Sequence, residues 1–226
     1  MLSNRVLFVA LVALLGGGSW LVGQSQGDAK RPLDLPAGKV GRDEEDEEDE
    51  TESIIFYGQE YEADAFFWCL DRSGSMIGAR LATLKQEVTQ VIATLTNRAE
   101  FGLVAFADNH TAWNTQPVKA TVSNKASATA WVQSLVASGG TCMAPGAVQA
   151  VNICTQSRLR NKTVIIFSDG EPNCPFCAET VTAVTSANWQ RNPVNTLFVG
   201  GAGSTGAACM QQIASANGGT FAAVNE

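Results

Sequence analysis

Five oxygen-bearing side chains occur at spacings that could assemble a site for a hard divalent cation. Asp71, Ser73 and Ser75 alternate within Asp-Arg-Ser-Gly-Ser, so a turn at this point can aim all three side chains at one ion. Thr141 and Asp169 supply a further hydroxyl and a second carboxylate. Mg²⁺ binds about six oxygen ligands at about 2.1 Å and usually keeps several waters. We therefore predict a site for Mg²⁺, or for Mn²⁺ or Ca²⁺ in its place.

The charge of this set favours the capture of an acidic group. Two carboxylates balance the double positive charge of the ion, and the three hydroxyls are neutral. A cation held in this way keeps Lewis acidity for an incoming carboxylate. The pattern thus predicts a site that binds an Asp or Glu of a protein partner.

Apolar runs of strand length alternate with helical patterns and place these side chains at one edge of a sheet. Residues 65–70 and 163–168 read as buried strands, and they end directly before Asp71 and Asp169. Ligands of doubly wound sheets bind beyond the carboxyl ends of the strands. The alternation predicts an α/β domain with a mostly parallel sheet covered on both faces. The other predicted strands are 101–106, 111–121, 194–199 and 220–224, and the predicted helices are 80–97, 123–136, 145–154, 178–189 and 206–216.

Residues 63–224 resemble a von Willebrand factor type A domain. The stretch from Asp71 to Ser75 matches the Asp-x-Ser-x-Ser motif of that family's metal-ion-dependent adhesion site. Thr141 matches the family's threonine loop, and Asp169 matches its later aspartate. The resemblance implies that the two serines contact the metal directly and that the two aspartates often act through water. It also implies that Thr141 joins according to state and that a partner's carboxylate completes the shell.

The resemblance further implies a three-layer, doubly wound, Rossmann-like fold. Its six-stranded, mostly parallel sheet would have the strand order 3-2-1-4-5-6, with residues 111–121 as the antiparallel edge strand. We expect the domain to lack the usual C-terminal helix, because the sequence ends directly after the last predicted strand. The sheet face that this helix would cover is then expected to be exposed or covered by a partner.

The N-terminal quarter of the chain predicts export and a spacer. Residues 1–26 read as a signal peptide or an uncleaved N-terminal membrane anchor, since Arg5 precedes an apolar run at 6–15. Both alternatives place the domain outside the cytoplasm, secreted or periplasmic. Residues 27–62 read as a disordered acidic linker, because the unbroken acidic run at 43–50 repels itself. The two sharper alternatives for this run are a cation-binding tract and a tethered pseudo-ligand for the metal.

The cysteines allow three interpretations. An even number of six in an exported domain favours disulfides, but the sequence does not determine their pairing. Cys174-Pro-Phe-Cys177 also resembles a glutaredoxin motif, so a thiol–disulfide oxidoreductase is the alternative function, and a structural zinc site is a third possibility. We expect Cys142 and Cys209 near the 174–177 loop, stapling loops around the metal. The pattern places Cys69 and Cys154 inward as buried thiols.

These observations favour an extracytoplasmic binding module over an enzyme. The formal net charge of −7 falls mostly on the acidic run, so the near-neutral domain is a poor match for nucleic acid. His110 is the only histidine, and without a second base we build no catalytic triad from it. We expect a membrane association only if the N-terminal segment stays uncleaved.

Overall fold

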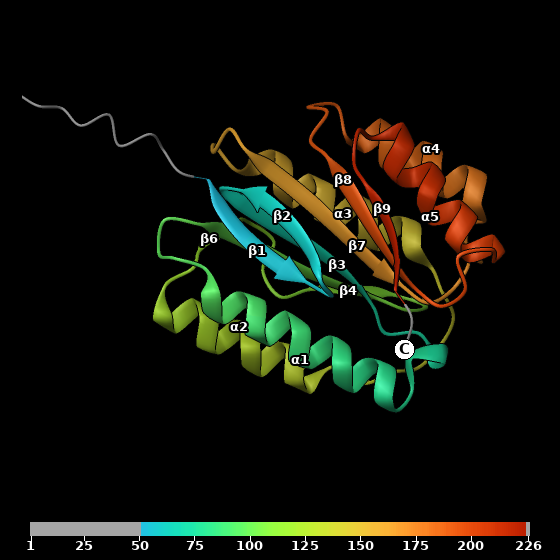
Figure 1. The fold of residues 1–226 in the computed structure, drawn as a ribbon, viewed down its shortest axis with the longest axis horizontal. Helices are drawn as coiled ribbons and strands as arrows, with labels where there is room; N and C mark the ends of the chain where they lie inside the picture. The colour runs from blue at the N-terminus through green and yellow to red at the C-terminus, as the bar shows by residue number, and fades with distance from the viewer. Residues whose placement is uncertain (1–50, 225–226) are drawn as a thin grey trace, which may run out of the picture. The chain divides into compact units, whose positions relative to one another are not determined.

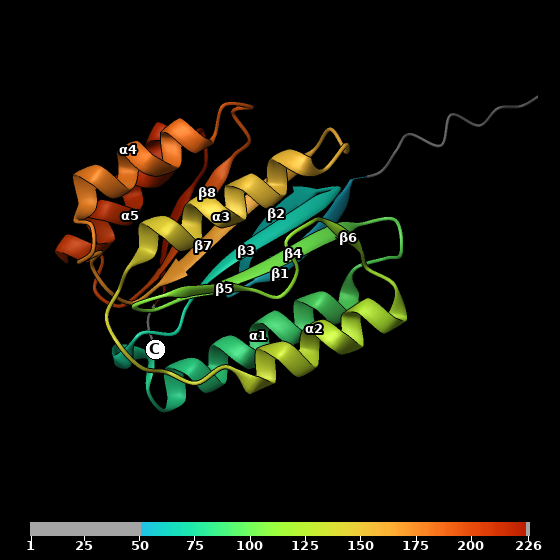
Figure 2. The same ribbon diagram turned by 180° about the vertical axis from the view of Figure 1, so that it is seen from behind.

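The computed structural model describes residues 51–224, so the predicted export signal and the acidic run at 43–50 lie outside the described part. Within that part, no helix has the length and apolar character needed to cross a membrane. A central sheet carries helices on both faces (Figures 1 and 2). Its strands are β3 (Ala65–Asp71), β4 (Glu100–Phe106), β5 (His110–Ala112), β6 (Val118–Lys119), β7 (Lys162–Ser168), β8 (Val194–Val199) and β9 (Phe221–Val224).

The strand order is β5-β4-β3-β7-β8-β9, which confirms the predicted order 3-2-1-4-5-6. Neighbouring strands are parallel from β4 to β9, and β5 is antiparallel to β4 at the edge. The predicted edge strand at 111–121 is divided into β5 and β6, both paired with β4. Pro117 lies in the interruption between β5 and β6, where its lack of a backbone N–H costs no hydrogen bond between strands.

Two layers of helices enclose the sheet. Helices α1 and α2 lie on one face, and α3, α4 and α5 lie on the other (Figures 1 and 2). Strand β3 is buried at every position, since Trp68 faces the α1 side and Phe67 faces the α3 side. This two-sided burial is why the strand reads as a continuous apolar run. The helices are α1 (Ala79–Thr94), α2 (Val122–Ser134), α3 (Met143–Gln156), α4 (Cys177–Ala187) and α5 (Thr205–Ala216). A short 3-10 helix, η1 (Gly74–Met76), lies between β3 and α1.

The predicted linker is wrong for residues 52–62, which form a β-hairpin. Strands β1 (Glu52–Phe56) and β2 (Gln59–Ala63) pair antiparallel around Tyr57 and Gly58, which both have positive φ as a tight hairpin turn requires. Alternate side chains are buried in both strands, while Glu60 and Glu62 of β2 lie on the exposed face beside Ser53 and Ile55 of β1. The high charge of the segment therefore concealed a strand pattern of period two.

The hairpin covers part of the sheet face on which α1 and α2 lie. The ring of Phe56 lies 6.5 Å from that of Trp68 and 6.2 Å from that of Phe167, measured between centroids. Both contacts are on the α1 side of the sheet, where the hairpin shares one core with α1 and α2. The chain thus closes this region with its own N-terminal strands.

Candidate metal centre

The five predicted side chains all come from the edge of the sheet where the parallel strands end. Asp71 is the last residue of β3, and Asp169 directly follows β7, its parallel neighbour. Ser73 and Ser75 lie in the turn after β3, at the start of and within η1. Thr141 lies in the loop between α2 and α3. Three separate loops therefore meet at this edge.

The carboxylate of Asp71 is buried and is held by two donors from the chain. The backbone N–H of Ser73 donates to Oδ1 at 2.7 Å, and the hydroxyl of Ser168 donates to Oδ2 at 2.5 Å. Burial, with a smaller contribution from the nearby Asp169, raises the pKa of Asp71 to about 6, although these hydrogen bonds act to lower it. A cation at this edge would favour the ionised form.

The hydroxyls of the motif lie at distances that suit a small hard ion. Ser73 Oγ and Ser75 Oγ are 3.0 Å apart, and Ser75 Oγ donates to Asp169 Oδ1 at 2.7 Å. Adjacent ligands of an octahedral ion with bonds of about 2.1 Å are separated by about 3.0 Å. The serine pair therefore has the spacing of two neighbouring Mg²⁺ ligands. Ser75 is exposed, so this edge is open to solvent.

Thr141 is positioned by loops that follow the site strands. Its N–H donates to Asn173 Oδ1 at 3.1 Å, and the Asn173 N–H donates back to the Thr141 carbonyl at 3.1 Å. A Cβ placed on Gly170 would lie only 3.3 Å from Thr141 Oγ1, so this hydroxyl lies beside the Asp169 loop. The residues thus gather as the sequence predicted, with all five at one edge.

Asp108 holds the loop that carries Thr141, a role that sequence reasoning missed. Asp108 Oδ1 accepts from the Gly140 N–H at 2.7 Å, just beyond the end of β4. Gly139 has φ +76°, and a Cβ there would lie 2.3 Å from Asp108 Oδ2, so only glycine is accommodated. An acidic residue after a buried strand was the available signal, since Asp71 and Asp169 share it.

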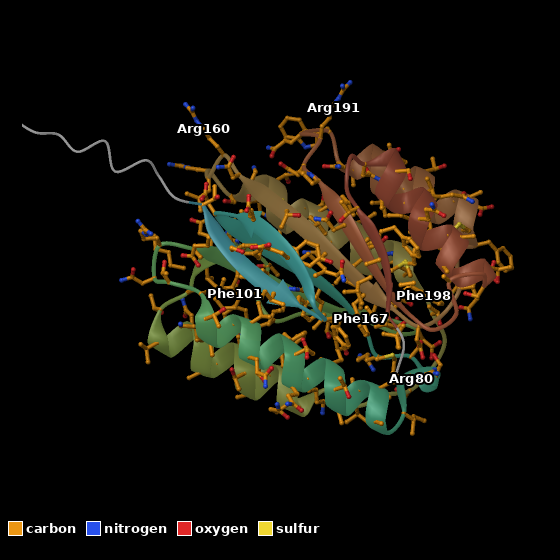
Figure 3. All side chains as sticks on the ribbon, in the orientation of Figure 1. Arg80, Phe101, Arg160, Phe167, Arg191 and Phe198 are labelled. Atoms are coloured by element: carbon orange, nitrogen blue, oxygen red, sulfur yellow. A yellow bond between two sulfur atoms is a disulfide. The ribbon has the colours of Figure 1, made fainter. Side chains whose placement is uncertain are left out.

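Arg80, at the start of α1, is a second residue that the motif search missed. Its Nη1 donates to Asp169 Oδ2 at 2.6 Å in a salt bridge. In Figure 3, Arg80 lies near the ends of β3 and β7. Arg160 and Arg191 lie at the opposite end of the strands, just before β7 and β8 begin. Within residues 51–224, no group of three or more His, Cys, Asp or Glu side chains could hold a metal ion. Any cation bound at this edge would therefore rely on hydroxyl ligands as well.

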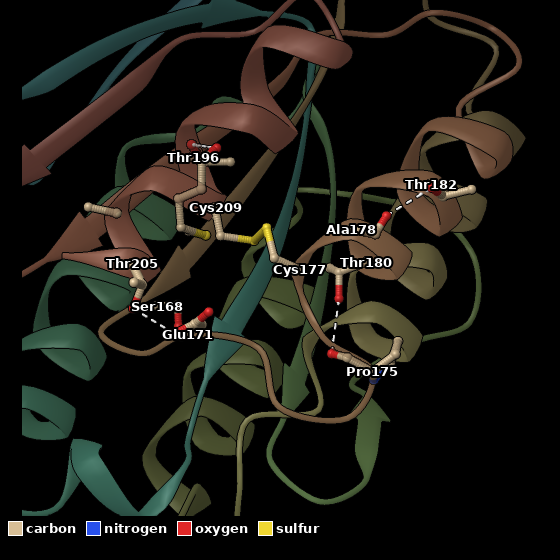
Figure 4. The surroundings of a disulfide bond; sticks show 12 residues. Ser168, Glu171, Pro175, Cys177, Ala178, Thr180, Thr182, Thr196, Thr205 and Cys209 are labelled. Carbon is tan, nitrogen blue, oxygen red and sulfur yellow. Dashed lines mark hydrogen bonds between the residues drawn. A yellow bond between two sulfur atoms is a disulfide. The ribbon is translucent and has the colours of Figure 1, made fainter. Parts of the chain in front are cut away.

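The disulfide pairing differs from the one that the redox alternative requires. Cys174 bonds Cys142, and Cys177 at the start of α4 bonds Cys209 of α5 (Figure 4), so the two cysteines of the motif are not joined to each other. With this pairing, neither cysteine of the motif is a free thiol, whereas the oxidoreductase alternative needs a Cys174–Cys177 pair and the zinc alternative needs free thiolates. The expected proximity of Cys142 and Cys209 to the 174–177 loop is confirmed.

The structure also places the two remaining cysteines and the histidine. Cys69 and Cys154 are free and fully buried, as the pattern predicted. Burial raises the pKa of Cys154 to about 12 and that of Cys69 well above its usual value. His110 is the first residue of β5 and is exposed to solvent.

The sequence profile of the von Willebrand factor type A domain matches residues 67–226. Among curated proteins, inter-alpha-trypsin inhibitor heavy chain H4 of Homo sapiens is 26% identical over 110 residues, covering 46% of this chain and 12% of that protein. The same protein of Bos taurus is 25% identical over 130 residues, covering 54% of this chain and 13% of its own length. The chain therefore spans only a small part of the curated relatives it matches.

Solved structures share the fold at lower identity. A von Willebrand factor type A protein from Catenulispora acidiphila has a TM-score of 0.65 and 24% identity, covering 72% of this chain and 38% of that one. The corresponding domain of the type V pili tip protein Mfa5 from Porphyromonas gingivalis has a TM-score of 0.59 and 13% identity. The match covers 76% of this chain and 90% of that one. The pilus adhesin SpaC from Lactobacillus rhamnosus GG has a TM-score of 0.58 and 15% identity. The match covers 71% of this chain and 28% of that one.

Proposed function

This chain belongs to the von Willebrand factor type A domain family, and from that premise we propose that it is a binding module with a metal-ion-dependent adhesion site. The site holds Mg²⁺, or Mn²⁺ or Ca²⁺, and captures an acidic residue of a protein partner. The observation that carries the proposal is the serine pair of the motif, whose oxygens are 3.0 Å apart beside two carboxylates.

Each residue has a distinct part in this proposal. Ser73 and Ser75 would bind the cation directly, since their hydroxyls have the spacing of neighbouring ligands. Asp71 keeps both oxygens engaged by chain donors, which suits a contact through water. Asp169 supplies the second negative charge, and Thr141 adds a hydroxyl from the opposite loop. The bound cation supplies Lewis acidity toward the carboxylate of the partner.

Two further observations support a binding role outside the cytoplasm. Proteins with this fold include a pilus adhesin and a pilus tip protein. Disulfides persist in oxidising compartments, and this domain has two of them, Cys142–Cys174 and Cys177–Cys209. The proposal assigns the chain no catalytic activity, no nucleic acid partner and a secreted, periplasmic or N-terminally anchored location.

Calorimetric titration with Mg²⁺ and Mn²⁺ tests the proposal. The unmodified protein is expected to bind one equivalent of cation. Asp71→Ala is expected to show no binding heat, because it removes a carboxylate from the site and the acceptor that holds the Ser73 N–H. Asp64→Ala is the matched control, since Asp64 precedes the same strand at its other end. Equal heats from the parent protein and Asp71→Ala would refute the site.

A further inference from the structure

A cationic side chain already lies on one of the proposed metal ligands. Arg80 Nη1 donates to Asp169 Oδ2 at 2.6 Å, and it also lies 3.4 Å from the carbonyl oxygen of Ser75. The guanidinium thus contacts both the carboxylate and the motif turn. Figure 3 shows Arg80 at the end of the molecule where β3 and β7 stop.

The guanidinium lies between Asp169 and solvent. The side chain of Asp169 is 0% exposed, whereas that of Arg80 is 34% exposed. The other carboxylate oxygen of Asp169 accepts from Ser75 Oγ at 2.7 Å. Both oxygens of this carboxylate are therefore engaged by donors of the chain. A cation, or the water it carries, that approaches Asp169 has to replace one of these donors.

Electrostatics makes the guanidinium and a divalent ion exclude each other. A guanidinium group is a fixed positive charge in proteins, and the divalent ion is positive as well. Two cations a few ångströms apart repel each other strongly in a partly buried site. A metal ion at the serine pair would thus weaken the contact between Arg80 and Asp169, and that contact would weaken metal binding.

We propose that Arg80 is an internal competitor of the metal ion. The guanidinium and a divalent cation occupy Asp169 alternately, so Arg80 sets the cation concentration at which the site fills. Without a bound cation, the salt bridge also stabilises this edge, because it neutralises one of two neighbouring carboxylates. This inference rests on the proposed cation site and adds a residue that determines its affinity.

Calorimetric titration with Mg²⁺ of three proteins tests this proposal: the parent, Arg80→Gln and Arg72→Gln. Arg80→Gln is expected to bind Mg²⁺ about three- to tenfold more tightly, because a partly exposed ion pair no longer has to break. Arg72→Gln removes the same charge from the same edge, but Arg72 lies against the Val136 carbonyl at 3.4 Å. We expect the Mg²⁺ affinity of Arg72→Gln to differ from that of the parent by less than about twofold, since salt screens a surface charge that is not paired with Asp169.

Thermal unfolding provides a second readout that does not depend on binding heat. In EDTA, Arg80→Gln is expected to unfold at a lower temperature than the parent, because two carboxylates then face each other without the guanidinium. Excess Mg²⁺ is expected to raise its unfolding temperature by more than it raises that of the parent.

The outcomes separate the two proposals. Equal Mg²⁺ affinity in the parent and Arg80→Gln would overturn the competitor role while leaving the cation site intact. The same gain in Arg72→Gln as in Arg80→Gln would also overturn it, since net charge alone would then explain the effect. If none of the three proteins binds Mg²⁺, the proposed cation site fails, and the competitor role fails with it.

Discussion

The residues of the site differ in how far the sequence predicts them. Asp71 and Asp169 each follow a buried strand, so strand patterns alone place both at one sheet edge. Asp108 and Asn173 were missed, because each holds a loop 32 residues away in the sequence. Such contacts depend on how loops close, which neither periodicity nor motif spacing describes. Arg80 was missed for a related reason, since it reads only as one charge on a helix.

The buried thiols allow a prediction about reactivity. Burial raises the pKa of Cys154 to about 12 and that of Cys69 well above its usual value, so both stay protonated at pH 9 in the folded protein. The thiolate is the reactive form. Iodoacetamide at pH 9 is therefore expected to leave both unmodified in the native protein and to label both in urea.

Mass spectrometry of peptides after alkylation measures this directly. The disulfide-bonded cysteines serve as internal controls, since they stay unlabelled with or without urea unless a reductant is added. Rapid labelling of Cys69 or Cys154 in the native protein would contradict the buried, protonated state.

Elements were predicted best where hydrophobic patterning was simple. Strands buried on both faces, such as β3 and β7, agree with their predicted ranges to within about a residue at each end. The β1–β2 hairpin reads as linker in the sequence, because its glutamates follow an acidic run and mask the alternating pattern of buried residues. Helix α2 begins one residue before its predicted start at 123, and its N-cap is Thr121, whose side chain accepts from the Asn124 N–H. Hydroxyl residues at both 121 and 123 make that end ambiguous in sequence.

The hairpin predicts a contrast between two neighbouring side chains of β1. Phe56 is fully buried against the sheet, while Ile55 is 68% exposed. Phe56→Ala is expected to lower the free energy of unfolding by about 3–5 kcal/mol, because it leaves a cavity in the core. Ile55→Ala is expected to change it by less than about 0.5 kcal/mol.

Urea unfolding followed by tryptophan fluorescence measures both values on one strand. The paired design controls for expression and for the loss of any apolar side chain in this segment. Similar small effects from both substitutions would show that the hairpin is not part of the folded core, as a linker would predict.

At the scale of the whole domain, the fold and the disulfides converge on the same edge. The sheet brings β3 and β7 side by side, and the loops after them carry the oxygen ligands. Cys142 adjoins Thr141 and is bonded to Cys174, so this disulfide ties the threonine loop to the loop that follows Asp169. The second disulfide joins α4 to α5 behind that loop. Six cysteines allow about 15 pairings, so only the folded chain determines which ones form.

The most direct test of the central claim is anomalous diffraction from crystals grown with Mn²⁺. We predict one strong anomalous peak, bonded at about 2.1–2.2 Å to the hydroxyls of Ser73 and Ser75. We expect Asp71 and Asp169 beside it and Arg80 turned away from Asp169. A map with Mn²⁺ only at other positions, or with this edge unchanged at saturating Mn²⁺, would contradict the account.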